Sequence, residues 1–325
     1  MQTLHQVPQG ATARRPSWKE LPDAVRTAVE ERLGARVVRA RSQDAGFTAG
    51  FASRLRLDDG SGAFVKAVNG VDHPSIRLAY RQEAAVVAAL PDRVPAPRLR
   101  WSAELDGGWF VLAFHEIDGR PPHRPWRVPQ LRAVLAALGP LAAALTPVPQ
   151  GMPALPSVAH DQPHFGYWRE LADDPDAGAL LPRHPHLPRQ RMERLAELEE
   201  RWVAAASGDC AVHFDLRDDN VLLDGEGAVW ICDWNWLTVG APWLDLVGLL
   251  VAAHGDGLDA DAALAAHPLA RGVPPRAVDA FLAALAGYYT AAAGQEHLPS
   301  SPWLRHHQAW YRDATMSWLG RRLRW

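Results

Sequence analysis

The chain has 325 residues, of which 48% are hydrophobic and 22% charged, and its formal net charge is −3. This composition excludes a disordered chain, and the length allows one large domain or two lobes. No long block of Lys and Arg indicates a nucleic-acid-binding surface, and no run approaches the roughly 20 apolar residues of a membrane span. The polar N-terminus has no apolar secretion signal. We therefore expect a cytoplasmic protein with neither a nucleic-acid nor a membrane partner.

Cysteine and lysine are both rare. Cys210 and Cys232 have neither a disulfide framework nor metal-ligand spacing, so we expect two reduced core residues. The basic residues are almost all Arg, and Lys19 and Lys66 are the only lysines. A lysine that persists against such a bias is a candidate for a chemical role.

The first part of the chain predicts a mainly antiparallel sheet with one inserted helix. After an expected flexible leader over 1–17, apolar residues recur every four positions, which predicts a helix over 18–33 that Gly34 ends. The turn at 58–62 favours a hairpin between the strands on either side of it. The predicted strands cover 37–40, 51–57, 63–68, 99–102 and 109–114, and the inserted helix covers 75–90.

Helices dominate after the breaker cluster at 118–122. The predicted helices cover 131–145, 167–172, 190–206 and 277–293. The strong strand signal in this half is a hairpin over 220–233. We therefore predict an α+β fold: a small antiparallel-sheet lobe over 18–118, a linker near 115–120, and a larger, mainly helical lobe over 119–325.

The segment from His213 to Asp233 carries the strongest chemical signal. A hairpin returns its two ends to the same place, so Asn220 and Asp233 are expected to share a metal ion. Asp215, five residues before Asn220, supplies a carboxylate that can accept the proton of an alcohol. Amide and carboxylate oxygens suit the hard Mg²⁺ ion. Phosphoryl transfer needs this combination of a metal and a group that orients the attacking hydroxyl.

The pattern H-x-D-x-x-x-x-N over 213–220, followed by a hairpin that ends in Asp233, resembles kinase-fold enzymes. With Asp233-Trp234-Asn235 after the hairpin and Gly-x-Pro-x-x-Asp-Leu over 240–246, it is most similar to the aminoglycoside phosphotransferase and choline kinase family. The resemblance implies a two-lobed protein-kinase-like fold. Neither the HRD nor the DFG motif of protein kinases is intact and no APE segment follows, which favours a small-molecule acceptor.

The resemblance also implies roles within the catalytic segment. Asp215 is the catalytic carboxylate, and Asp245 braces the catalytic loop. His213 is expected to brace the loop too, in preference to acting as a base. Arg217 either contacts phosphate or lies on the surface. Asp218 and Asp219 are expected to be solvated loop carboxylates.

The first lobe offers a matching nucleotide site. Lys66 lies within an apolar strand and needs a partner, for which Glu83 on the following helix is the obvious residue. The kinase fold uses such a pair to hold the α- and β-phosphates. A loop with small residues allows backbone N–H groups to approach phosphates, although an ordinary hairpin turn would look the same. Its candidate residues are Gly46, Phe47, Thr48 and Gly50.

The segment over 112–119 resembles the hinge of the family, where backbone groups bind the adenine edge. The resemblance assigns this role to His115 and Ile117.

The acceptor is expected between Asp215 and the C-terminal helices, where a polycation would need converging acids. The candidate acids are Asp256, Asp259, Asp261, Glu296 and Asp313. The Trp-rich tail, with Trp303 and Trp310, is expected to serve core packing more than sugar stacking, whereas Trp234 and Trp236 are candidate walls of the site.

The leading hypothesis is an enzyme that uses ATP, or alternatively GTP, with Mg²⁺ to phosphorylate a hydroxyl of a small molecule. The acceptor is an antibiotic, inactivated for resistance or self-protection, or a sugar, nucleoside or amino alcohol. A nucleotide-binding regulator without activity is the alternative. It would not need to keep Asp215 and the two metal ligands. A protein kinase is disfavoured by the missing motifs, and the oligomeric state is left open.

Overall fold

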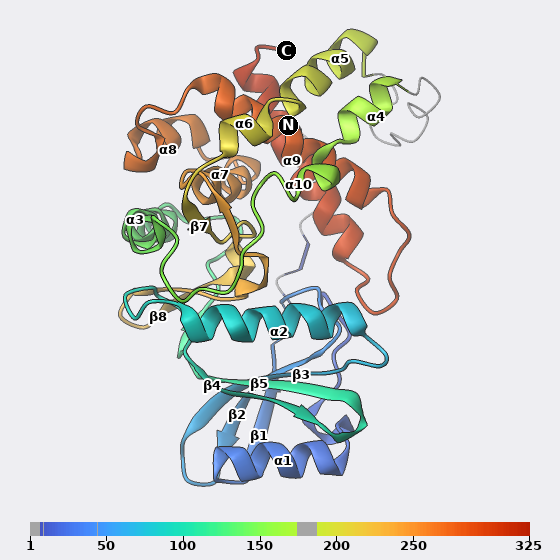
Figure 1. The fold of residues 1–325 in the computed structure, drawn as a ribbon, viewed down its shortest axis with the longest axis vertical. Coiled ribbons are helices and arrows are strands. Elements are labelled where there is room, and N and C mark those ends of the chain that lie inside the picture. Colours follow the sequence, from blue (N-terminus) through green and yellow to red (C-terminus); the bar gives the residue numbers. More distant parts are fainter. Residues whose placement is uncertain (1–6, 9, 44, 174–186) are drawn as a thin grey trace.

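A computed structural model describes residues 7–8, 10–43, 45–173 and 187–325. The first lobe is built on one antiparallel sheet in the order β1-β2-β3-β5-β4 (Figure 1). Its strands are β1 (Val37–Ser42), β2 (Phe51–Leu57), β3 (Gly62–Asn69), β4 (Leu99–Leu105) and β5 (Trp109–His115). The five predicted strands are therefore present, each within a few residues of its expected bounds.

Two helices cover the two faces of this sheet, α1 (Asp23–Leu33) on one and α2 (Pro74–Ala89) on the other (Figure 1). Successive residues of a strand point to opposite faces, so Val111 and Ala113 of β5 join the α1 core while Leu112 and Phe114 join the α2 core. The central strands β2, β3 and β5 are thus buried on both sides, which holds them in one register.

The helix predicted over 18–33 is interrupted. A 3₁₀ turn (Trp18–Glu20) comes first, and Leu21 then takes an extended conformation before α1 begins. Pro22 explains the break, because a proline disfavours the helical conformation of the residue before it. Gly34 ends α1 with φ 81°, a left-handed conformation that glycine adopts at low cost.

The second lobe is mainly helical, as predicted. Its helices are α3 (Val128–Leu145), α4 (Tyr167–Asp173), α5 (Arg189–Glu199), α6 (Trp202–Ala206), α7 (Leu244–Gly255), α8 (Ala260–Ala266), α9 (Pro275–Ala293) and α10 (Leu304–Arg322). The helix predicted over 190–206 is two helices, α5 and α6, with a break at Glu200 and Arg201. Three further helices, α7, α8 and α10, were not predicted. Nearly every side of α7 is buried, so it has no polar face and no helical periodicity to read.

Two small sheets support the catalytic segment. β7 (Cys210–Val212) pairs with β10 (Thr238–Gly240), and β6 (Gly119–Arg120) pairs with β8 (Val221–Asp224), which pairs with β9 (Val229–Ile231). The predicted hairpin is β8 and β9. The strands β6, β7 and β10 have two or three residues each, too short to show an alternating pattern. Short 3₁₀ turns cover Asp106–Gly108, Gln162–Phe165, Asp218–Asn220, Trp234–Trp236 and Pro268–Ala270.

Among the helices that the structure describes, α3 alone is long and apolar enough to cross a membrane by length and composition. Its apolar side faces the core of the second lobe. The buried residues include Leu131, Val134, Leu138, Leu141 and Leu145. Core helices of this kind pass the same test, and the burial of this face accounts for the composition.

The described part of the expected leader does not extend freely from the fold. Thr12 and Ala13 are buried, and the backbone N–H of Arg14 donates to the carbonyl of Ser300, 2.8 Å away. Residues 10–17 therefore lie against the rest of the chain. Their polar sequence shows no periodicity because several of their contacts are made with backbone carbonyls.

Leu55 of β2 tests the packing between α1 and the sheet. Its side chain is 1% exposed in the α1 core, whereas Leu78 on α2 is 67% exposed. We predict that Leu55→Ala lowers the free energy of unfolding by about 2–5 kcal/mol, since it removes buried methyl groups and leaves a cavity. Leu78→Ala, the matched control, should change it by less than about 0.5 kcal/mol. Urea denaturation measures both, and equal losses would contradict the assigned packing.

Candidate active site

The catalytic loop over 213–220 joins β7 to β8 and is held from below by Asp245. The two Asp245 carboxylate oxygens accept hydrogen bonds from the backbone N–H groups of His213 and Phe214, each at 2.8 Å. Phe214 has φ 65°, a left-handed conformation that is uncommon for a bulky residue. The two bonds hold the loop in this strained shape, so Asp245 has the bracing position that the sequence analysis expects of it.

His213 is buried beneath the same loop. Its Nε2 lies 2.8 Å from the carbonyl oxygen of Cys232, an atom that can only accept, so Nε2 carries the proton. The imidazole ring meets the edge of Trp234, with ring centres 4.8 Å apart. His213 thereby ties the loop to the end of the hairpin. Trp234 is buried as well and does not wall the site.

Asn220 and Arg217 hold Asp215 from two sides. Asn220 Nδ2 donates to the backbone oxygen of Asp215 at 2.8 Å and to its Oδ2 at 3.2 Å, so the amide oxygen of Asn220 is the atom left to bind a cation. Arg217 pairs with Asp215 and also with Asp219, where Nε lies 3.0 Å from Oδ1. Burial raises the pKa of Asp215 above its usual range, and the positive charge of Arg217 opposes that rise.

Lys66 connects the two lobes. From β3, its Nζ lies 2.8 Å from both carboxylate oxygens of Glu83 on α2, and it also contacts the carboxylate of Asp233 at the end of the hairpin. Burial alone would lower the pKa of Lys66, but Asp233 and Glu83 raise it. Burial alone would raise the pKa of Asp233, but Lys66 holds it below its usual range. The structure thus brings together the three residues that sequence reasoning chose.

A cavity of about 380 Å³ lies between the lobes, a size typical of small-molecule sites. The charged part of its wall includes Lys66, Glu83 and Asp233. Gly46 and Thr48 of the small-residue loop also line the cavity. Apolar side chains supply much of the rest of its wall: Ala52, Phe64, Ile76, Ala79, Pro97, Leu222 and Trp236. The cavity therefore combines an apolar part with a charged part.

The other two candidates in the small-residue loop, Gly50 and Phe47, lie in different surroundings. A side chain at Gly50 would collide with the hydroxyl of Tyr80, whose oxygen would be 2.7 Å from the added Cβ, so this position requires glycine. Phe47 does not line the cavity. Its ring packs on His307 of α10, with centres 4.3 Å apart.

The hinge candidates His115 and Ile117 both line the cavity. The N–H of His115 donates to the carbonyl of Arg98, and the carbonyl of Ile117 accepts from the N–H of Gly119, both at 2.9 Å. The carbonyl of His115 is an acceptor and the N–H of Ile117 is a donor, the two kinds of group that could bind the edge of a purine base.

Comparisons with known proteins agree with this geometry. The sequence matches the model of the phosphotransferase enzyme family over residues 45–293. The chain belongs to this family. The match covers every candidate residue for nucleotide, metal and catalysis, but not the N-terminal segment or α10. No curated protein matches the chain significantly.

Solved structures of aminoglycoside phosphotransferases share the fold. A thermostable mutant of APH(4)-Ia, in a ternary complex with ADP and hygromycin B, aligns with TM-score 0.58 and 14% identity over 92% of this chain and 98% of its own. Spectinomycin phosphotransferase APH(9)-Ia, in complex with ADP and spectinomycin, aligns with TM-score 0.62 and 12% identity over 92% and 94%. An enzyme from Alicyclobacillus acidocaldarius aligns with TM-score 0.53 and 16% identity over 89% and 92%. The predicted kinase-like fold is confirmed.

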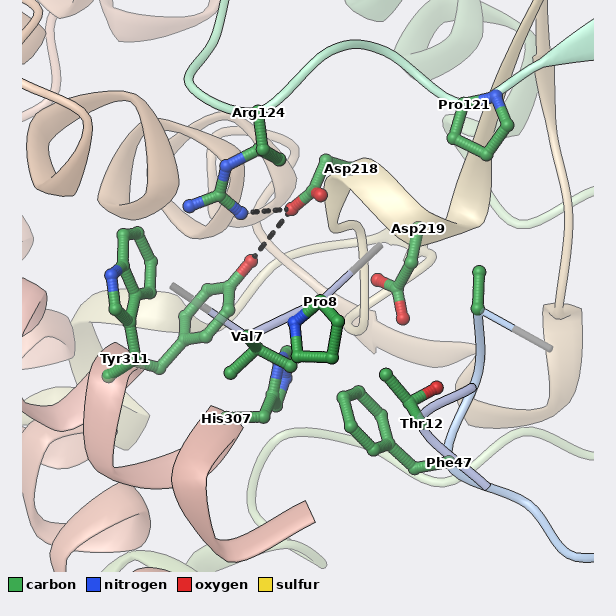
Figure 2. Close-up of a pocket in the computed structure, with 12 residues that line it drawn as sticks. Val7, Pro8, Thr12, Phe47, Pro121, Arg124, Asp218, Asp219, His307 and Tyr311 are labelled. Atoms are coloured by element: carbon green, nitrogen blue, oxygen red, sulfur yellow. Dashed lines mark hydrogen bonds and ion pairs between the residues drawn. The ribbon is translucent and has the colours of Figure 1, made fainter. Parts of the chain in front are cut away.

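In this member of the phosphotransferase family, Asp218 and Asp219 are not solvated, contrary to expectation. Arg124 Nη1 lies 2.8 Å from Asp218, and Tyr311 Oη lies 3.3 Å from it (Figure 2). Asp219 pairs with Arg217. The sequence gives no sign of the pairing between Arg124 and Asp218, since Arg124 comes from a proline-rich segment 94 residues earlier in the chain.

Arg124 also binds Asp256, whose carboxylate is therefore not available to bind a polycationic acceptor. Its Nε and Nη2 bind the two oxygens of Asp256 at 2.7 and 3.0 Å, and its guanidinium lies 4.4 Å from the ring centre of Trp310. The backbone N–H of Trp126 donates to Asp256 at 2.7 Å. This Arg124 cluster (Arg124, Asp218, Asp256, Trp310 and Tyr311) joins the catalytic loop to α7 and α10.

The remaining acceptor candidates do not converge. Asp259 caps α8 by accepting from the N–H of Ala262, Asp261 pairs with Arg322, Asp313 pairs with Arg312, and Glu296 is exposed. Trp310 and Trp318 are core residues, Trp303 and Trp325 are partly exposed, and Trp236 lies in the wall of the cavity. The predicted role in core packing is therefore confirmed for Trp310 but is wrong for Trp303.

Beside Asp215, a 30 Å³ cavity is lined by aromatic residues that include Tyr289 and Tyr311.

Asp256 tests the Arg124 cluster. We predict that Asp256→Ala lowers the free energy of unfolding by about 3–5 kcal/mol, because it leaves the buried charge of Arg124 without its bidentate partner. The exposed control Asp72→Ala should cost less than about 0.5 kcal/mol. Urea denaturation measures both. An Asp256→Ala protein as stable as its control would refute the pairing.

Proposed function

We propose that this protein transfers the γ-phosphoryl group of ATP, or alternatively GTP, to a hydroxyl group of a small molecule. The observation that carries the proposal is the position of Lys66, which contacts Glu83 and Asp233 inside the cavity between the lobes. A buried amine held between two carboxylates is placed to neutralise phosphate groups. The family match supports the phosphotransferase class.

The donor atoms near the hairpin fit Mg²⁺. The amide oxygen of Asn220 and the carboxylate of Asp233 are hard oxygen ligands, and Mg²⁺ commonly takes one or two such ligands and completes its shell with phosphate oxygens and water. Bound there, Mg²⁺ would neutralise charge on the nucleotide phosphates. The contact between Lys66 and Asp233 brings the metal carboxylate and the phosphate-binding amine into one site.

The chemistry follows from the proposed roles. Asp215 accepts the proton of the acceptor hydroxyl while the hydroxyl oxygen forms a bond to the γ-phosphorus. The bond between that phosphorus and the β–γ bridging oxygen breaks, and the oxygen leaves as part of ADP. Lys66 stabilises the charge that gathers on the phosphates. The products are a phosphate ester, ADP and a proton on Asp215.

The remaining residues would position the two substrates. The loop with Gly46, Thr48 and Gly50 would lie over the phosphates, and the hinge residues His115 and Ile117 would bind the base. Arg217 either contacts the transferred phosphate or holds Asp215 in its ionised form.

For the acceptor we propose several classes of hydroxylated small molecule. The structural relatives were crystallised with hygromycin B and spectinomycin, so we propose hydroxylated antibiotics as the first candidates and resistance or self-protection as the corresponding role. The acids that a polycation would need do not converge in the part of the chain that the structure describes. Sugars, nucleosides and amino alcohols, including uncharged ones, therefore belong in the same search.

Asp215→Ala tests the catalytic assignment. We predict that kcat falls about 100- to 10,000-fold, the contribution of a positioned base, while the Kd for Mg-ATP stays unchanged. The Asp72→Ala variant should keep both values. A full rate of transfer by Asp215→Ala would show that this carboxylate is not the base.

A screen identifies the acceptor and separates the enzyme from a regulator. The protein is incubated with ATP, Mg²⁺ and a panel of hydroxylated antibiotics, sugars and nucleosides, and mass spectrometry detects the gain of a phosphate group. Asp215→Ala serves as the blank. Nucleotide binding without transfer to any member of a broad panel would favour the regulator.

A further inference from the structure

The N-terminal segment 10–17 contacts the small-residue loop of the nucleotide site. Thr12 Oγ1 donates to the carbonyl of Gly46 at 2.9 Å, and Arg15 Nη1 donates to the carbonyl of Gly50 at 3.0 Å. Figure 2 shows Thr12 beside Phe47 of this loop. The segment thus binds the loop through backbone carbonyls at both of its glycines.

A second segment, over 300–301, also holds the loop. Ser301 Oγ, just before α10, donates to the carbonyl of Phe47 at 2.7 Å, and Ser300 accepts from the N–H of Arg14. Both of these supports, 10–17 and 300–301, lie outside residues 45–293, which match the family. The loop over the phosphates is therefore fastened by parts of this chain that the family match does not include.

Arg15 reaches past the loop into the nucleotide cavity. It lines the same cavity as Lys66 and Asp233, and its charge acts on the carboxylate of Asp233. A Cβ added to Gly46 would lie 2.9 Å from Arg15 Nη2, so the guanidinium sits directly against the loop. Its Nε is buried and has no hydrogen-bond partner among the described residues. A cationic side chain that lines this cavity and has a buried, unused Nε donor indicates an anionic ligand there.

We propose that Arg15 is a binding residue for the polyphosphate of the nucleotide, acting together with Lys66 in the same cavity. The proposal rests on the proposed function, since it assumes that this cavity holds the nucleotide. A guanidinium binds phosphate oxygens through planar, charge-assisted hydrogen bonds, whereas a lysine acts as a point charge. Residues 10–17 are then part of the active site and fasten its loop while they deliver this cation.

The test compares Arg15→Gln with Arg14→Gln in the full-length protein. Arg14 has the same charge and lies on the same segment, but its side chain is exposed. Isothermal titration measures the affinity for adenosine, ADP and ATP with Mg²⁺ present. Arg15→Gln should weaken ADP and ATP binding about 10- to 100-fold, the value of hydrogen bonds to a charged group. Adenosine affinity and the Arg14→Gln protein should match wild type, and Arg15→Lys should recover part of the loss.

The outcomes separate this proposal from the one on which it rests. Wild-type affinity of Arg15→Gln for ATP would refute the role of Arg15, and so would an equal loss for adenosine and ATP, which marks a purely structural residue. Retained adenosine binding also shows that the variant is folded. A wild-type protein that binds none of the three ligands would contradict the proposed function itself.

Discussion

The charge of Lys66 is the constraint on which the arrangement of the two lobes depends. Its side chain is almost fully buried in a strand of apolar neighbours, and an unpaired charge in such a place costs several kcal/mol. One partner, Glu83, comes from α2 and fixes the helix against the sheet. The other partner, Asp233, comes from the second lobe and fixes the hairpin against the first lobe. A single amine therefore links the sheet, its helix and the catalytic lobe.

The catalytic loop depends in turn on charges beneath and beside it. Asp245 holds the strained backbone at Phe214, and the Arg124 cluster holds Asp218 to α7 and α10. These residues hold Asp215 and Asn220 in place, which is what phosphoryl transfer would require of a site that works by positioning and charge.

The sequence predicts correctly the contacts of residues that lie in one short segment or that stand out from their neighbours. Asp215, Asn220 and Asp233 follow one another in a loop and a hairpin, and Lys66 stands out in an apolar strand. Sequence reasoning failed where the partner is distant. The sequence predicts a solvated Asp218 and an acceptor-binding Asp256, because their shared partner Arg124 lies 94 and 132 residues away in the chain. It also failed for α7, where burial on nearly all sides erases periodicity, and for residues 10–17, whose contacts are made with backbone carbonyls that any sequence provides.

The most direct test of the link between the lobes is a double-mutant cycle between Lys66 and Asp233, read as the affinity for Mg-ATP. Lys66→Met removes the phosphate-binding amine, and Asp233→Asn weakens the metal ligand. Because both act on the same phosphates, we predict that the double variant loses less affinity than the sum of the single losses, by about 1 kcal/mol or more. A cycle between Lys66→Met and the remote Asp72→Ala should be additive. Additive losses for Lys66 and Asp233 would contradict the shared site.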